Sequence, residues 1–242
     1  MNTQYYRSLL PPNDKGVYDR ILDSWNSKEE IVILEAPNKT HNSIERIVEY
    51  VALDNPSIFY VDYYRFEHTK SPFCSKLTFR FFHNHEQICR AERDIGKWTN
   101  YVSSYLPAQS TQQEKLWLIY DYTARQVFYR ERGHKLSHTV LGCLPKYGHA
   151  AVCEGIAKAF KMLCNAANLP CIVVSGVVTC NGGTERHAWN MVEIDGATRH
   201  IDVTSEITRA QLSGKADQCS FLKRDVDMQG YQWESHCLPV CD

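Results

Sequence analysis

A cysteine, a histidine and an aspartate occur in the order Cys153, His187, Asp202, and together they have the residue types of a thiol-based acyl-transfer site. A thiol attacks a carbonyl carbon when a neighbouring imidazole takes or shares its proton. A carboxylate beside the imidazole fixes its tautomer and supports its charged form. Since the three residues are distant in sequence, whether they act together depends on the elements that carry them.

Cys153 lies at the start of a predicted amphipathic helix within the stretch His149–Pro170. Apolar residues recur at helical spacing along it, at Ile156, Phe160, Leu163 and Ala167. Gly155 leaves room for a neighbouring backbone, and Pro170 ends the helix after Leu169. Unpaired backbone N–H groups and the helix dipole at this end favour a thiolate. The alternative is that Cys153 is a small buried hydrophobe, as most free cysteines are.

His187 and Asp202 lie on the two arms of a predicted hairpin. The β-branched stretch Cys171–Thr179 predicts a strand, and a turn at Asn181–Gly183 follows it. Two further strands are expected at Arg186–Ile194 and Thr198–Thr204, because Asp195-Gly196 between them is a strong signal for a two-residue hairpin turn.

This turn sets the register of the hairpin. Ile194 is expected opposite Ala197, and Trp189 opposite Asp202. His187 then projects from the same face as Asp202, as a diagonal neighbour at roughly 7–8 Å between backbone positions. The pair is therefore expected to hydrogen-bond, either as a base and its orienting acid or as a cross-strand polar pair without a catalytic role.

The segments VCEGIAKAF, RHAWNMVEIDG and RHIDVTSE together resemble the transglutaminase-like superfamily, and specifically its bacterial branch of cysteine proteases. The resemblance implies that Cys153 is the nucleophile, His187 the base and Asp202 the orienting acid. It extends upstream through EKLWLIYDYTARQVFY and SHTVLGCLPKYGHAAVCEG, and downstream to QCSFLKRDVDM. Two positions depart from the family pattern: Ile156, where tyrosine is more frequent, and Ser205, where many members have tryptophan. Both departures concern the shape of the pocket.

Composition and charge set broad limits on function. The chain has 242 residues, with 27 Lys and Arg against 28 Asp and Glu, so a nucleic-acid or anionic-membrane partner is not expected. The N-terminus does not resemble a signal peptide, and no apolar run is long enough to span a membrane. The ten cysteines do not form a disulfide-type pattern, which favours a reducing, cytoplasmic location.

The sequence predicts neither a metal site nor a cofactor. C-x-x-C pairs and acidic calcium-loop motifs do not occur. His236, Cys237 and Cys241 cluster near the end of the chain, but a second pair of ligands is missing from the nearby sequence.

The first part of the chain, 1–107, reads as an α/β subdomain. Helices are expected at Asn13–Ser24, from Thr40 to the Asn55-Pro56 pair, and up to Pro107, and strands at Glu29–Ala36, 57–68 and Phe73–His83. The last helix has an apolar face formed by Ile88, Ala91, Ile95, Trp98, Val102 and Leu106. The aromatic residues Phe59, Tyr60, Tyr63 and Tyr64 suggest core packing more than a binding platform.

The second part, 108–242, begins with a helix whose capping box is either Ser110 with Gln113 or Thr111 with Glu114. Its inward face is expected to comprise Leu116, Ile119, Tyr120, Thr123 and Val127. The stretch Glu131–His149 reads as a polar, solvated loop in which His134, His138 and His149 are ordinary loop residues. The backbone N–H of Cys153 is the first candidate donor to an oxyanion, and Tyr147, His149 and Trp117 are candidates for a second.

We therefore expect an α+β fold in which 108–242 form a transglutaminase-like, papain-like catalytic domain, with the cysteine-bearing helix packed on an antiparallel sheet. The expected reaction is acyl transfer through a thioester on Cys153, ending in hydrolysis of a peptide or side-chain amide in a peptide or protein substrate. Amine transfer would need an apolar channel that excludes water from the thioester. Hydrolysis is favoured because the loop before Cys153 is expected to be solvated, and because Trp189 and Met191 are expected to pack on the helix instead of lining such a channel. The alternatives are amine transfer to protein glutamine and a peptide-binding module without turnover, and the oligomeric state is left open.

Overall fold

The structure is a computed structural model that describes residues 4–35, 39–130, 135–180, 183–213 and 220–242. It divides into two compact units, Asn2–Arg93 and Asp94–Asp242. The change of unit falls inside helix α4 (His85–Ser104), whereas the predicted boundary follows Pro107. The assignment of domains to 1–107 and 108–242 stays a prediction.

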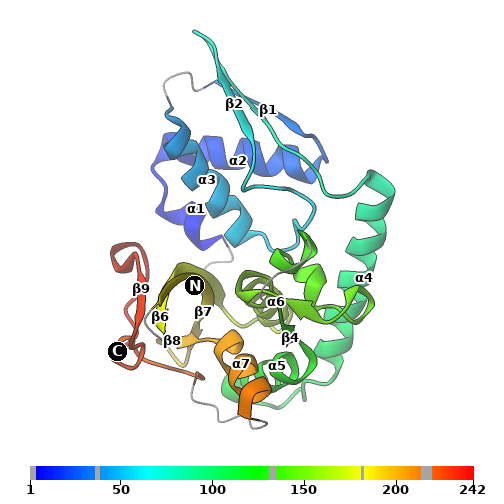
Figure 1. Cartoon of the computed structure of the whole chain (residues 1–242), viewed down its shortest axis with the longest axis vertical. Coiled ribbons are helices and arrows are strands. Elements are labelled where there is room, and N and C mark those ends of the chain that lie inside the picture. The colour runs from blue at the N-terminus through cyan, green and yellow to red at the C-terminus, as the bar shows by residue number, and fades with distance from the viewer. Residues whose placement is uncertain (1–3, 36–38, 131–134, 181–182, 214–219) are drawn as a thin grey trace. The chain divides into compact units, whose positions relative to one another are not determined.

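The N-terminal unit packs helices on a small antiparallel sheet (Figure 1). Its elements are α1 (Tyr5–Leu9), α2 (Pro12–Asn26), β1 (Ile31–Leu34), α3 (His41–Asp54), β2 (Glu67–Lys70), β3 (Ser75–Thr78) and the first turns of α4. The strand order is β1-β3-β2. Along β1, Val32 and Leu34 are buried while Ile31 and Ile33 are exposed, as expected for a sheet with one covered face.

The predicted strand at 57–68 is wrong over most of its length. Only Glu67 and His68 lie in β2, and the preceding residues pair with the chain after β3 through a single bridge, Val61 with Phe81. Phe59 and Tyr60 are buried in the core, so they pack as expected. Of the remaining two aromatic residues, Tyr64 is exposed and stacks on Tyr63 with ring centroids 4.3 Å apart.

Helices α4 and α5 (Gln112–Gln126) match their predicted faces. The predicted α4 positions Ile88, Ala91, Ile95, Trp98 and Val102 are buried, whereas Leu106 is half-buried and follows the end of the helix at Ser104. In α5 the Thr111 and Glu114 capping box forms, and Leu116, Ile119, Tyr120, Thr123 and Val127 at its C-cap are buried. Among the described residues, no helix is both long and apolar enough to cross a membrane.

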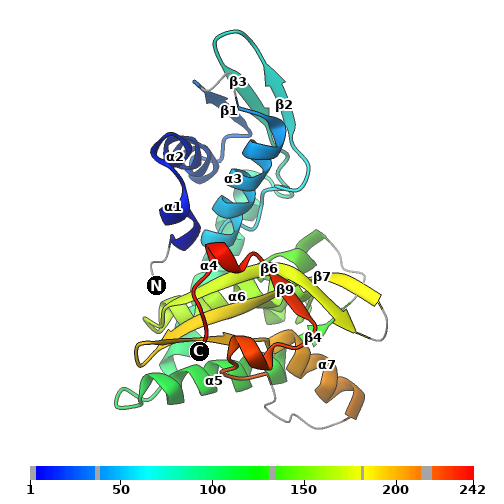
Figure 2. The same cartoon turned by 90° about the vertical axis from the view of Figure 1, so that its left-hand side faces the viewer.

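The C-terminal unit contains a four-stranded antiparallel sheet with the order β8-β7-β6-β9 (Figure 2). The strands are β6 (Cys171–Cys180), β7 (Gly183–Ile194), β8 (Ala197–Ile201) and β9 (Tyr231–Trp233), and α6 (Cys153–Ala166) packs on β6 and β7. Ile194 pairs with Ala197, which confirms the predicted register, and Asp195 and Gly196 both have positive φ, as a type I′ turn requires. The predicted turn at Asn181–Gly183 falls partly outside the described residues.

The predicted strand Thr198–Thr204 is wrong in its last three residues. Strand β8 ends at Ile201, and helix α7 (Val203–Ser213) begins two residues later. The reason is visible at Asp202, whose Oδ1 accepts a hydrogen bond of 3.1 Å from the backbone N–H of Ser205. A carboxylate that accepts from the third residue of a helix is a favourable N-cap, so Asp202 starts α7 instead of continuing the strand.

The stretch before Cys153 is not the solvated loop that the sequence suggested. The predicted loop, Glu131–His149, is flanked by the short pairing strands β4 (Phe128–Tyr129) and β5 (Ala150–Ala151). Its described part forms the 3₁₀ turns η1 (Lys135–His138), η2 (Val140–Cys143) and η3 (Pro145–Tyr147). All of η2 is buried. Gly155 lets this segment approach α6, since a Cβ there would lie 2.3 Å from the carbonyl oxygen of Ser137. His134, predicted as a loop residue, lies outside the described residues.

Candidate active site

Cys153 is the first residue of α6, as predicted. It is half-buried, and no described side chain caps the helix N-terminus, which starts after Val152. The first backbone N–H groups of a helix have no partner within the helix, so the N–H of Cys153 is available to an anion. The apolar face predicted behind it is buried at Ile156, Phe160 and Leu163.

His187 and Asp202 are in direct contact. His187 Nε2 lies 2.8 Å from Asp202 Oδ2, and their side chains are 11% and 2% exposed. The β7–β8 ladder runs from Ile194–Ala197 to Asn190–Ile201 and so brings Asp202 level with Trp189, as the hairpin register predicted. A buried carboxylate that faces an imidazole accepts its N–H, so the proton on Nε2 is directed at Asp202.

The other imidazole nitrogen of His187 is left for Cys153. The Cys153 side chain also interacts with His187, and because Nε2 is engaged with Asp202, Nδ1 is the ring nitrogen left for the thiol. Burial opposes protonation of His187, but Asp202 and then Cys153 outweigh it and raise the pKa of His187 to about 10. The structure thus brings the three predicted residues into one chain of contacts, although their catalytic role stays a prediction.

Asp202 has further partners that the sequence did not reveal. Tyr231 of β9 donates its hydroxyl to Asp202 Oδ2 at 2.6 Å, and the Ser205 N–H occupies Oδ1. Burial raises the pKa of the Asp202 carboxyl, but the charge and hydrogen bond of His187, with those of Tyr231 and Ser205, lower it overall. Tyr231 was missed because nothing in its local sequence indicates that β9 pairs with β6.

Trp189 is placed differently from the prediction. It packs among aromatic rings, with its centroid 5.2 Å from that of Tyr231 and 5.9 Å from that of Trp233, instead of on α6. The helix is contacted by the neighbouring Asn190, which donates to the carbonyl oxygen of Ala157. Since alternate residues of a strand face opposite sides of the sheet, Trp189 lies on the side away from Asn190, where it contacts the Tyr231 and Trp233 rings of the edge strand β9.

A second buried polar chain lies behind Trp189. The Trp189 indole donates to His200 Nδ1 at 2.9 Å, and His200 Nε2 lies 2.8 Å from Asp225 Oδ1. Asp225 also accepts the backbone N–H of Cys241, and burial, with Asp225 nearby, raises the pKa of the Cys241 thiol to about 12.

His200, Asp225 and Cys241 have atoms within 4.8 Å of one another, a spacing that a metal ion would need. Because Nδ1 of His200 accepts from Trp189, the proton of the neutral ring sits on Nε2, where Asp225 accepts it. A metal at Nε2 would require this hydrogen bond to break. His236 and Cys237 cluster with Cys241 in the sequence, but in the structure their ligand atoms lie close to Glu234 instead.

The three candidates for a second oxyanion donor have other contacts. The Tyr147 hydroxyl donates to Asp94 at 3.0 Å, and Trp117 packs edge-to-face on Phe221. His149 Nδ1 lies 2.6 Å from the carbonyl oxygen of Gln126, so Nδ1 carries the proton and the neutral ring offers only an acceptor at Nε2. The neutral His149 side chain therefore cannot donate from Nε2 to an oxyanion.

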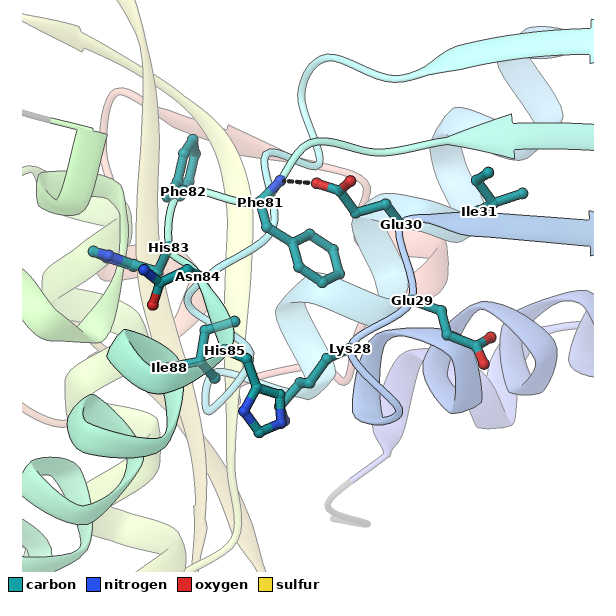
Figure 3. A pocket seen from close by; sticks show the side chains of 10 residues that line it. All are labelled: Lys28, Glu29, Glu30, Ile31, Phe81, Phe82, His83, Asn84, His85 and Ile88. Atoms are coloured by element: carbon teal, nitrogen blue, oxygen red, sulfur yellow. Dashed lines mark hydrogen bonds between the residues drawn. The ribbon is translucent and has the colours of Figure 1, made fainter.

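A pocket of about 740 Å³ lies in the N-terminal unit (Figure 3). It is lined by Lys28, Glu30 and the segment Phe81–His85, and the Phe81 N–H donates to Glu30 Oε1 at 3.0 Å. Lys28 is engaged with Glu92 and Tyr60. None of the residues predicted to be catalytic lines this pocket.

Comparison with known families identifies the segment that carries the three residues. Residues 99–203 match the family model of the transglutaminase-like superfamily, a range that includes Cys153, His187 and Asp202. This segment belongs to the transglutaminase-like superfamily. The α+β fold of the transglutaminase-like segment, with a cysteine-bearing helix on an antiparallel sheet, agrees with this assignment. No curated protein matches the sequence.

Several solved structures are similar to the chain at low identity. One is a transglutaminase, at 16% identity and a TM-score of 0.39, covering 59% of this chain and 44% of that one. A candidate cysteine protease from Cytophaga hutchinsonii has 13% identity and a TM-score of 0.38, with 58% and 61% covered. The periplasmic domain of TgpA from Pseudomonas aeruginosa has 14% identity and a TM-score of 0.37, with 60% and 57% covered. The chain thus spans less than two thirds of each.

Proposed function

We propose that Cys153, His187 and Asp202 form a catalytic triad that hydrolyses amide bonds in a peptide or protein through a thioester on Cys153. The observation that carries this proposal is the position of His187, which contacts Asp202 through Nε2 at 2.8 Å and also interacts with Cys153. A base held between a nucleophile and an orienting acid is the arrangement that activates a thiol.

In the proposed reaction His187 takes the thiol proton, and the sulfur attacks the carbonyl carbon. The C–S bond forms as the carbonyl becomes an oxyanion, towards which the backbone N–H of Cys153 donates. Collapse of this intermediate breaks the C–N bond, and the imidazolium gives its proton to the departing amine. Water then attacks the thioester while His187 takes a proton from it, and cleavage of the C–S bond releases the acid and restores the thiol.

Hydrolysis is favoured over amine transfer by the packing of Trp189. An efficient amine transferase must hold the amine near the thioester and exclude water. Trp189 is 1% exposed and its ring is surrounded by Tyr231, Trp233 and His200, so it is not available to line an amine channel. The segment before Cys153 does not add to this preference, since η2 is buried and not solvated.

The deciding experiment gives the protein a glutamine-rich acceptor protein and a fluorescent amine, and follows amine incorporation, ammonia release and peptide cleavage in parallel. We expect ammonia release or peptide cleavage that Cys153→Ala abolishes, with little incorporation of the amine. Incorporation that depends on Cys153 would instead identify an amine transferase. Peptide binding without turnover in any assay would identify a binding module.

We propose a cytoplasmic location on the basis of cysteine chemistry. The eight cysteines whose side chains the structure describes are all free, as expected in a reducing compartment. One structurally similar protein is a periplasmic domain, and a periplasmic location is therefore the alternative that the experiment must distinguish. Fractionation of the native host, with the thiols of this protein trapped by alkylation at lysis, tests the location.

A further inference from the structure

Asp202 Oδ2 is shared between two donors. His187 Nε2 approaches it at 2.8 Å and the Tyr231 hydroxyl at 2.6 Å. A carboxylate oxygen that accepts a second hydrogen bond has less electron density for the first, so the two donors compete for the same charge. The hydroxyl of Tyr231 is therefore placed to moderate the interaction between Asp202 and His187.

The Tyr231 side chain is held in this position from several directions. Its ring packs edge-to-face on Trp189, and its centroid is 5.8 Å from that of His187. In the strand pairing, Tyr231 lies opposite Val178 of β6 and Trp233 lies opposite Gly176. Burial and the neighbouring Asp202 raise the pKa of Tyr231 far above its ordinary value, so the hydroxyl keeps its proton and acts as a donor at every physiological pH.

Ser205 closes the arrangement from α7. Its backbone N–H donates to Asp202 Oδ1 at 3.1 Å, while the Tyr231 hydroxyl donates to Oδ2. Both oxygens of the carboxylate are therefore engaged, and Oδ2 is the one that His187 and Tyr231 share.

We propose that Tyr231 is a positioning residue that limits the basicity of His187 by competing for Oδ2 of Asp202. The proposal rests on the triad function proposed above. His187 must take a proton from Cys153 and later give one to the leaving amine, and a base that binds its proton too strongly is slow in the second step. The competing hydroxyl keeps the imidazolium acidic enough to release its proton.

The groups that act on His187 are few and come from different elements. Asp202 and Cys153 favour its charged form, and burial opposes it. Tyr231 acts through Asp202, and Arg209 of α7 acts on Tyr231 by its positive charge. Removal of the Tyr231 hydroxyl therefore affects the pKa of His187 only through the contact between Asp202 and His187.

The test measures the pKa of His187 by NMR of its ring nitrogens in the full chain. Tyr231→Phe removes the hydroxyl and keeps the ring. The pKa of His187 is expected to rise by roughly half a unit to one unit, which is less than the about one to two units that a hydrogen bond to a charged group represents, because Tyr231 acts on His187 only through Asp202. Asp202→Asn should lower it by about one to three units, because the neighbouring negative charge is lost. Tyr18→Phe is the matched control, since its hydroxyl donates to a buried carboxylate, Asp54, in the N-terminal unit.

An unchanged or lowered pKa of His187 in Tyr231→Phe would overturn the proposal, because loss of the competing donor should strengthen the interaction between Asp202 and His187. A rise of the same size in Tyr18→Phe would overturn it as well, since the Tyr18 hydroxyl donates to Asp54 and not to Asp202.

This proton equilibrium is measured without turnover, so the two proposals fail separately. A protein that is silent in the amide assays but shows the rise in Tyr231→Phe would refute the hydrolase and support the competition at Asp202. In an active enzyme, the alkaline limb of the pH profile of kcat/KM should move to higher pH in Tyr231→Phe and to lower pH in Asp202→Asn. If the alkaline limb moved equally and in the same direction in Tyr231→Phe and Asp202→Asn, this would indicate a general loss of structure and would overturn the proposal.

Discussion

Gly176 of β6 lies directly across the strand ladder from His187 of β7. A Cβ at Gly176 would lie 2.3 Å from the backbone oxygen of Gln232 and 2.7 Å from the ring of Trp189. The absence of a side chain at this position lets β9 pair closely with β6, and β9 carries Tyr231 to Asp202.

Gly176→Ala is therefore expected to destabilise the protein and displace β9. Overpacking of this kind costs about 1–3 kcal/mol of the free energy of unfolding. Gly96→Ala is the control, because a Cβ at Gly96 in α4 would meet nothing within 4 Å, and alanine there is expected to stabilise the helix. Urea denaturation of both variants measures the difference. An unchanged stability in Gly176→Ala would mean that β9 moves away at no cost.

Cys153 is expected to react with iodoacetamide at neutral pH before Cys143 and Cys164. Burial raises the pKa of both of these thiols, and both are inaccessible, whereas Cys153 is half-buried at a helix N-terminus beside His187. Peptide mapping after limited alkylation gives the order, and His187→Ala should slow the labelling of Cys153. Labelling of Cys143 first would contradict the assignment of the nucleophile.

Asp202→Asn is expected to abolish most of the turnover while the fold persists. Asparagine can still accept the Ser205 N–H and cap α7, but it no longer offers a charged acceptor to His187. In the serine-protease triad the same type of change lowers kcat by roughly 10⁴. Steady-state kinetics beside a circular dichroism spectrum separates the loss of activity from unfolding. Full activity would assign the orienting role to another group.

His187 should make stability depend on pH in the alkaline range. The folded pKa of about 10 lies above the ordinary value of 6.5, so the stabilising contribution is complete below 6.5 and is lost as the pH rises towards 10. Between these values the folded state binds one more proton than the unfolded state, and the free energy of unfolding should fall by up to about 1.4 kcal/mol per pH unit. Denaturation of wild type and His187→Gln from pH 6 to pH 10 measures the difference, which should narrow as the pH rises.

The sequence predicted the parts of the site that depend on short-range pattern. The Asp195-Gly196 turn fixed the register that brings His187 to Asp202, and helical periodicity placed Cys153 at the start of α6. The end of β8 was predicted too late, because an aspartate followed by Val203 and Thr204 fits a strand by propensity and becomes a helix cap only through its contact with Ser205.

The contacts that the sequence did not predict depend on long-range pairing. Tyr231 reaches Asp202 because β9 adds to the edge of β6 after a separate helix, and no local signal specifies that pairing. The buried η2 segment was taken for solvent-exposed because polar residues surround it. Its packing depends on Gly142 and Gly155, whose neighbours are set by tertiary structure.

Asp202 ends a strand, begins a helix and holds His187, so a single carboxylate couples local folding to the chemistry of the site. When the first turn of α7 frays, the Ser205 N–H leaves Oδ1 and the acid loses one of the contacts that fix its direction. Opening of that turn therefore loosens the acid of the triad, which His187 and Tyr231 then hold through Oδ2 alone. The exchange rate of the Ser205 amide proton should accordingly report, in the resting protein, the fraction of molecules whose site is ready to react.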